Sequence, residues 1–253
     1  MRYFIRLSYH GSQFCGWQKQ PGTPTVQQAL EAAFSAILGQ TIQIVGCGRT
    51  DTGVHAHEYF AHFDVSEPLD IDLLVYRANA YLEEGVAIQE IFSVSDDSHA
   101  RFDATSRTYK YFIHTQKNPF LNDRSFYLRG PKPVNLDLMN QFCALLLTKK
   151  DFSAFEKKGS DNKHSLCHVT EAFWEKTPQG YIFTITANRF LRNMVRAIVG
   201  TGLMIGTEKI TLKEVDTYID QKIQVSLSIT APAHGLFLWN IKYPIRNDSK
   251  DQQ

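Results

Sequence analysis

The chain turns at Gly46-Cys47-Gly48-Arg49-Thr50-Asp51-Thr52-Gly53-Val54-His55-Ala56, a loop between two strand patterns at 42–47 and 59–65. Glycines on both sides of Arg49 and Asp51 allow tight backbone turns that present these side chains at the mouth of a cleft. In an arbitrary loop of this kind, Asp51 would more often close an Asx-turn with Arg49 as a surface ion partner. We nevertheless expect chemistry here, because loops on a rigid scaffold carry many binding and catalytic residues.

This loop belongs to a first half with the predicted order β-α-β-β-α-β. Apolar and polar residues alternate over 3–10, and this period of two predicts a half-buried strand. Thr25 as N-cap and Gln28 as its capping-box partner begin an amphipathic helix, which Gly39 ends. The remaining elements expected in this half are a helix over 70–82 and a strand over 86–94.

The second half shows a similar order and adds one helix. A capping box at Thr211 and Glu214 begins the additional helix. The loop equivalent to 48–58 shrinks to a hairpin turn at 177–180, so the long loop occurs in the first half alone. The expected elements are a strand over 107–114, a helix over 135–148, strands over 167–176 and 181–188, a helix over 189–205 and a strand over 236–243.

These patterns predict an α+β fold of two tandem split β-α-β-β-α-β lobes, whose mainly antiparallel sheets meet at a central cleft. We expect an N-terminal lobe over 1–105, a C-terminal lobe over 106–246 and a polar tail over 247–253. Residues 1–105 carry six basic and thirteen acidic side chains, whereas 106–253 carry twenty-one and thirteen. A polyanion is therefore drawn to the second half, although a chance imbalance on solvated faces explains the counts equally well.

The composition is that of an ordinary soluble protein, with 43% hydrophobic and 21% charged residues among 253. The first residues lack a continuous apolar signal region, and no run of the sequence is long enough to span a bilayer. We therefore expect a cytoplasmic protein. The four cysteines, which lack C-x-x-C spacing and are expected to be reduced packing residues, are Cys15, Cys47, Cys143 and Cys167.

The loop motif G-R-T-D-T-G-V-H-A at 48–56 closely resembles a signature of the tRNA pseudouridine synthase A family. The likeness extends over nearly the whole chain in the correct order. Two departures are His10, where the family has Asp after the opening Tyr, and the poorly matching stretch 157–164. The other segments that resemble family motifs are Ser8-Tyr9-His10-Gly11, Phe14, Gly16-Trp17-Gln18, and residues 102–111, 151–155, 190–200 and 231–236.

The resemblance implies that the protein isomerises uridine to pseudouridine at positions 38, 39 and 40 of the tRNA anticodon arm, after flipping the base. It implies that Asp51 is the catalytic carboxylate, that Tyr109 stacks on the flipped base and that Arg196 pairs with Asp51, with Arg49 as a further candidate. The reaction needs no redox partner or metal, so we expect no cofactor. The resemblance also implies a homodimer in which both subunits contribute to tRNA binding.

Further basic residues are candidates for RNA contacts. Arg189, Arg192 and Arg196 are spaced at i, i+3 and i+7, which predicts one basic face on the helix expected over 189–205. For Arg189 and Arg192, a solvated face and an RNA contact are equally expected. Tyr111 shares a strand face with Tyr109 and is expected in the core. A basic segment that suits phosphate contacts, or is simply solvated, contains Lys149, Lys150, Lys157 and Lys158.

Two other functions fit parts of the sequence. A non-catalytic RNA-binding module fits the duplicated split βαβ units, but it has no need of the Asp51 loop. A glycoside hydrolase requires a second carboxyl group, for which Glu58 and Asp103 are available. We expect no metal site, because the spacing in the candidate group His164, Cys167 and His168 matches no common zinc pattern and a fourth ligand is missing.

Overall fold

A computed structural model describes residues 1–130, 133–157, 159, 164–224 and 230–244. The predicted β-α-β-β-α-β order of the first half is confirmed, and the strand expected over 86–94 has the same bounds. Its elements are β1 (Arg2–Tyr9), α1 (Val26–Leu38), β2 (Val45–Gly46), β3 (His55–Asp64), α2 (Ile71–Tyr81) and β4 (Val86–Val94). The second half contains β5 (Ser106–His114), β6 (Phe126–Tyr127), α3 (Leu136–Thr148), β7 (Val169–Thr177), β8 (Gly180–Ala187), α4 (Met194–Gly206), α5 (Leu212–Asp220) and β9 (Leu236–Lys242).

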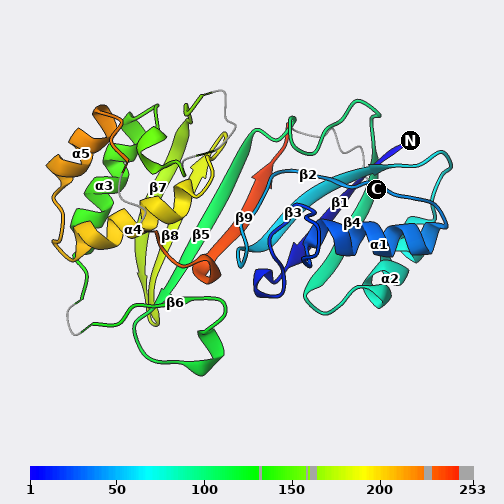
Figure 1. The fold of residues 1–253 in the computed structure, drawn as a ribbon, viewed down its shortest axis with the longest axis horizontal. Coiled ribbons are helices and arrows are strands. Elements are labelled where there is room, and N and C mark those ends of the chain that lie inside the picture. The colour runs from blue at the N-terminus through cyan, green and yellow to red at the C-terminus, as the bar shows by residue number, and fades with distance from the viewer. Residues whose placement is uncertain (131–132, 158, 160–163, 225–229, 245–253) are drawn as a thin grey trace, which may run out of the picture.

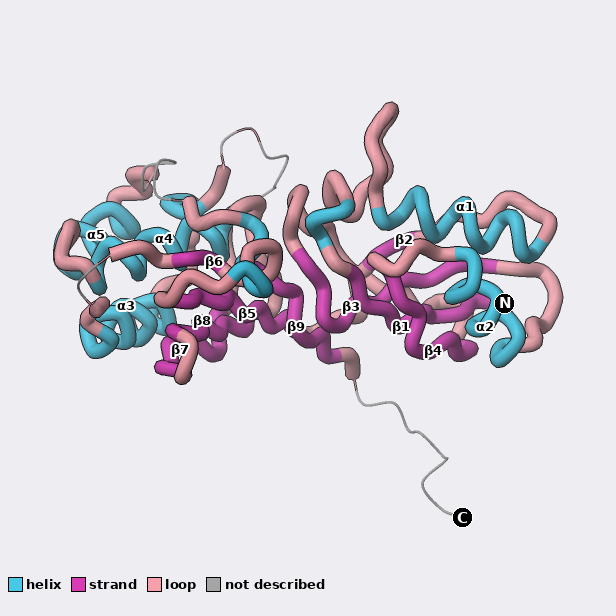
Figure 2. The backbone as a smooth tube through the Cα atoms, turned by 90° about the horizontal axis from the view of Figure 1, so that it is seen from below, coloured by secondary structure: helices cyan, strands magenta, loops and turns pink. Residues whose placement is uncertain are grey.

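The strands form one nine-stranded, mainly antiparallel sheet with the order β4-β1-β3-β9-β5-β8-β7, and β2 and β6 pair with β3 and β5. The C-terminal strand β9 lies in the middle, parallel to β3 and antiparallel to β5. Figure 2 shows the strands as one continuous band, and Figure 1 shows the helices in two groups at opposite ends of it. The mainly antiparallel mixed fold is confirmed. The expectation of two sheets was wrong, because β9 pairs with a strand from each half.

Two hydrophobic cores lie along this sheet. One contains Trp17, Phe34 and Phe63 with other residues of the first half, together with Leu238 and Ile241 from β9. The other contains large side chains of the second half, among them Phe142, Phe152 and Phe183, and also Leu236 from β9. Tyr109 packs against both cores. The strand β9 and the residues beside it therefore hold the two halves together.

The helix caps follow the local signals in the sequence. The Thr25 side chain accepts a hydrogen bond from the Gln28 N–H, and Gly39 takes a left-handed conformation at the end of α1. Thr211 and Glu214 form the predicted capping box of α5. None of the helices within the described ranges is both long enough and apolar enough to cross a bilayer.

Helix α4 begins at Met194, five residues later than the sequence suggested. Asn193 has a φ of 66°, and this left-handed conformation separates the helix from the loop before it. Leu191 in that loop is buried, which gives the loop the apolar pattern of a helix face. The expected basic face of Arg189, Arg192 and Arg196 was therefore wrong, since Arg196 alone of the three lies on a helix.

Candidate active site

The loop between β2 and β3 that carries Asp51 rests on buried aromatic side chains. Trp17 and Tyr59 stack with ring centroids 4.1 Å apart, and both are buried. The Tyr59 hydroxyl donates to the Gly48 carbonyl, and the Thr50 carbonyl accepts from the Trp17 N–H at 3.3 Å. The Thr50 hydroxyl is 2.8 Å from the buried Tyr9 hydroxyl. The backbone just before Asp51 is therefore fixed from beneath.

Two glycines of the opening motif let the chain approach this loop closely. A Cβ atom on Gly11 would lie 2.1 Å from the Val54 carbonyl oxygen. A Cβ atom on Gly16 would lie 2.5 Å from the Thr50 carbonyl oxygen, and Gly16 has a φ of +86°. Since real Cβ atoms do not approach so closely, the opening motif and the Asp51 loop are built as one unit.

His55 connects three of the motifs found in the sequence. Its Nδ1 accepts from the Gly11 N–H at 3.0 Å, so its Nε2 carries the proton and donates to the His234 carbonyl at 3.1 Å. The ring stacks on Phe237 with centroids 4.4 Å apart, and burial lowers the pKa of His55 to about 4. His55 is therefore a neutral link. Its position in the loop motif was visible in the sequence, but its partners were not.

His10, which departs from the family pattern, lies against this link. The His10 and His55 rings meet edge to face with centroids 4.5 Å apart. His10 Nε2 is 3.4 Å from an Asp123 carboxylate oxygen, and its Nδ1 is 2.8 Å from the Ser12 hydroxyl. His10 therefore contacts His55, Asp123 and Ser12 behind the Asp51 loop.

Asp51 and Arg196 form an ion pair between the two halves of the chain. The Arg196 Nη1 is 3.7 Å from an Asp51 carboxylate oxygen, and the two side chains are 21% and 39% exposed. Arg196 Nε also donates to the Ala231 carbonyl at 2.8 Å, which fixes the guanidinium. Arg49 points to a different partner, because its Nε donates to the Gln18 side-chain oxygen at 3.1 Å. The carboxylate is thus held by Arg196 and remains accessible to a substrate.

Tyr109 lies on β5 beside this pair. Its ring meets Phe190 edge to face with centroids 5.0 Å apart. Burial raises the pKa of the Tyr109 phenol, and the charge of the neighbouring Asp51 adds to this effect. Tyr111 on the same strand is fully buried and donates its hydroxyl to the Pro232 carbonyl at 2.8 Å, so its expected place in the core is confirmed.

The basic residues proposed as RNA contacts differ in their surroundings. The Lys149 Nζ lies 2.6 Å from carboxylate oxygens of both Asp216 and Asp220, and these hydrogen bonds raise the pKa of Lys149. Lys149 therefore fastens α3 to α5. Arg189 Nη1 is 3.2 Å from His164 Nδ1. Lys150, Lys157 and Arg192 are exposed, and Lys158 lies outside the described residues.

The carboxylates considered for a glycoside hydrolase, Glu58 and Asp103, form hydrogen bonds with other parts of the chain. The Glu58 carboxylate accepts from the Asn240 side chain at 2.9 Å and from the Ile241 N–H at 3.2 Å. The Asp103 carboxylate accepts from the His99 N–H at 2.7 Å. Both carboxylates thus serve to fix the backbone. In the part of the chain that the structure describes, no group of three or more His, Cys, Asp or Glu side chains is arranged to hold a metal.

This chain is similar to known proteins along nearly its entire length. A family model described as tRNA pseudouridine synthase matches residues 143–244. A protein of Parabacteroides distasonis named tRNA pseudouridine synthase A is 43% identical, and the match covers 96% of this chain and 96% of that protein. Proteins of the same name from Azobacteroides pseudotrichonymphae and Bacillus subtilis are 46% and 36% identical over 96% of this chain, with 97% and 99% of their own lengths covered.

Proposed function

The chain belongs to the tRNA pseudouridine synthase A family, and on that premise we propose that Asp51 is its catalytic carboxylate, held by Arg196. The protein is an isomerase that converts uridine to pseudouridine in tRNA. The observation that carries the proposed site is the ion pair at 3.7 Å between Asp51 and Arg196. It joins a glycine-flanked loop of the first half to a helix of the second, beside the half-buried Tyr109.

The chemistry requires little beyond a positioned carboxylate. The bond between uracil N1 and ribose C1′ breaks, the base rotates, and a bond forms between uracil C5 and C1′. The hydrogen on C5 leaves as a proton and N1 gains one, so the reaction involves no net oxidation. Asp51 serves either by adding to uracil C6 or by assisting formation of a glycal at the ribose. In both routes Arg196 pairs with the carboxylate and orients it.

A uridine stacked in an RNA stem is out of reach of Asp51, so the base leaves the stack before reaction. Tyr109 is the proposed platform for the flipped base, since an aromatic face offsets part of the lost stacking. Its contact with Phe190 and its place between the two cores fix the orientation of the ring. Arg49, exposed at the mouth of the loop, is proposed to support the active site from the RNA side.

The substrate positions proposed are uridines 38, 39 and 40 in the anticodon arm, as the family resemblance implies. The two halves are proposed to act as lobes, with 1–105 supplying Asp51 and 106–246 supplying most of the grip on RNA. The excess of basic residues after residue 105 supports this division. A homodimer whose subunits share one tRNA, acting in the cytoplasm where its substrate is processed, completes the proposal.

Tritium release tests this function directly. The protein is incubated, without added metal, with unmodified tRNA that carries tritium at uridine C5. A matched tRNA has cytidine in place of the uridines at positions 38, 39 and 40. We expect tritium release from the first tRNA and none from the second. Release from both would contradict the proposed positions, and free uracil in place of pseudouridine would indicate a hydrolase.

A further inference from the structure

The Arg107 side chain on β5 forms hydrogen bonds with several separate segments of the chain. Its side chain is half-buried, on the same strand face as Tyr109. Within the described residues, its guanidinium donates four hydrogen bonds, all to main-chain carbonyl groups. Nη1 donates to Ala104 O at 2.8 Å and to Asn188 O at 2.9 Å, and Nη2 donates to Arg101 O at 2.6 Å and to Cys47 O at 3.3 Å.

Two of these carbonyl groups belong to residues that begin the segments leading to Asp51 and to Arg196. Cys47 immediately precedes the loop that carries Asp51. Asn188 begins the segment that leads from β8 to α4 and thus to Arg196. The guanidinium of Arg107 therefore connects the segment that leads to Asp51 with the segment that leads to Arg196. These two side chains form the ion pair of the site.

Cys47 and Asn188 are also held by hydrogen bonds from their own N–H groups. The Cys47 N–H donates to the Phe60 carbonyl at 2.8 Å, and the Asn188 N–H donates to the His168 carbonyl at 3.2 Å. Each segment thus has one anchor in its own half of the sheet and one in Arg107. We propose that Arg107 is a positioning residue for the isomerisation, which sets the distance and orientation of Asp51 relative to Arg196.

The chemistry of the side chain supports this role. A guanidinium offers five N–H donors in a rigid plane, whereas a lysine ammonium is a single point on a flexible stem. Lysine at position 107 would keep the positive charge but could not serve four carbonyls in different directions. Because this inference rests on the proposed roles of Asp51 and Arg196, its test must separate a failure of those roles from a failure of Arg107.

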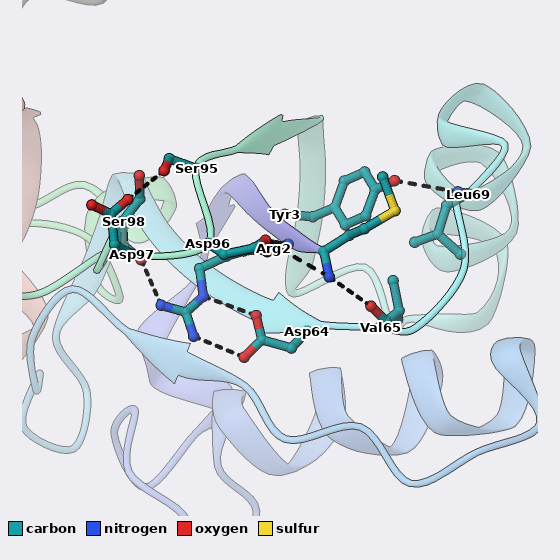
Figure 3. Close-up of polar contacts among 10 residues, drawn as sticks. Arg2, Tyr3, Asp64, Val65, Leu69, Ser95, Asp96, Asp97 and Ser98 are labelled. Carbon is teal, nitrogen blue, oxygen red and sulfur yellow. Dashed lines mark hydrogen bonds and ion pairs between the residues drawn. The ribbon is translucent and has the colours of Figure 1, made fainter.

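Arg2 on β1, which lies between β4 and β3 in the sheet, provides a matched control in the first half. Its side chain makes a bidentate pair with Asp64 at 2.8 Å and donates to the Ser98 carbonyl at 2.8 Å, as Figure 3 shows. It fastens β1 to neighbouring segments that do not carry Asp51 or Arg196. Arg2→Lys therefore removes a comparable network of hydrogen bonds with a purely structural consequence.

The experiment compares Arg107→Lys, Arg2→Lys and Arg196→Met with the wild-type protein in single-turnover tritium release from tRNA. We expect Arg107→Lys to slow the reaction by about 30-fold or more, because a displacement near 1 Å at an active site costs on the order of 10²-fold. Its KM for tRNA should stay within about threefold, since the RNA-binding surface is intact. Arg2→Lys should lower the melting temperature and leave the single-turnover rate unchanged.

A double-mutant cycle then asks whether Arg107 acts through Arg196. In the Arg196→Met background, Arg107→Lys should slow the reaction by less than about threefold, because the pair that it positions is already lost. A wild-type rate in folded Arg107→Lys, or losses that multiply fully in the double variant, would overturn the inference. Arg107→Gln serves as a second variant if Arg107→Lys does not fold. If Asp51→Asn retained activity, the proposed function would fail instead.

Discussion

Replacing Gly16 by alanine tests whether the opening motif holds the Asp51 loop in place. Gly16 has a φ of +86°, and an added Cβ atom would lie 2.5 Å from Thr50 O and 3.2 Å from the Asp51 carbonyl carbon. The left-handed conformation costs an alanine roughly 1–2 kcal/mol. The overlap adds about 1–3 kcal/mol, as other overpacked sites do. We therefore expect Gly16→Ala to destabilise the protein by about 2–5 kcal/mol.

The same contact predicts the effect on the reaction. To reach an ordinary contact of 3.4 Å, the Thr50 carbonyl has to move by about 0.9 Å, and the adjacent Asp51 moves with it. A shift of this size at reacting groups lowers the rate by on the order of 10²-fold. Since the residues proposed to contact phosphate groups lie outside this loop, the affinity for tRNA should change by less than about threefold.

Gly39→Ala is the control for the conformational cost alone. Gly39 also has a left-handed φ, +67°, but nothing lies within 4 Å of an added Cβ atom. This variant should lose only about 1–2 kcal/mol of stability and keep the wild-type rate. Single-turnover tritium release below the melting temperature of all three proteins compares them. A wild-type rate in folded Gly16→Ala would refute the reasoning, because the loop would then tolerate the displacement.

Three other predictions concern the platform, the grip on RNA and the response to pH. Tyr109→Phe should keep the turnover within about threefold of wild type, because the ring still stacks on the base. Tyr109→Ala should lower the turnover by about 10²-fold and the stability by on the order of 3 kcal/mol. Turnover near the wild-type value in a folded Tyr109→Ala variant would exclude Tyr109 as the platform. The double variant Lys150→Gln with Lys157→Gln should reduce the slope of log affinity for tRNA against log salt concentration by about 1.4–1.8. Lys149→Gln should leave this slope unchanged and lower the stability, since Lys149 is paired with Asp216 and Asp220. Equal changes of slope in the two variants would contradict the different roles of these lysines. Burial lowers the pKa of both His55 and His62 from 6.5 to about 4, so the unfolded chain binds more protons between these values. Stability should therefore fall as the pH drops below 6.5, by about 2 kcal/mol per histidine at pH 5, and equal free energies of unfolding in urea at pH 7 and pH 5 would contradict this.

Elements with local signals could be predicted from the sequence. The start and end of α1 follow from Thr25 and Gly39, because an N-cap hydroxyl and a left-handed glycine act on their own turn of helix. The loop motif likewise directed attention to Asp51, and the family resemblance paired it with Arg196. Their separation of 3.7 Å in the structure agrees with that pairing.

Features that depend on distant partners could not be predicted in this way. The pattern of β9 indicated a strand, but a period of two does not say that it lies between β3 and β5. The start of α4 was misplaced, because the left-handed Asn193 leaves the apolar pattern of the loop before it unchanged. Lys149 resembled its basic neighbours until the packing of α5 brought Asp216 and Asp220 beside it.

The central claim is that the Asp51 carboxylate performs the isomerisation. Its most direct test is single-turnover release of tritium from tRNA labelled at uridine C5, measured for Asp51→Asn beside the wild-type protein at saturating tRNA. We expect the variant to bind tRNA within about tenfold of wild type, because phosphate contacts supply most of the affinity. Its rate should fall below about a hundredth of the wild-type rate, since both addition to uracil C6 and formation of the glycal require the carboxylate. A rate above that level in a folded variant would contradict the assignment of Asp51.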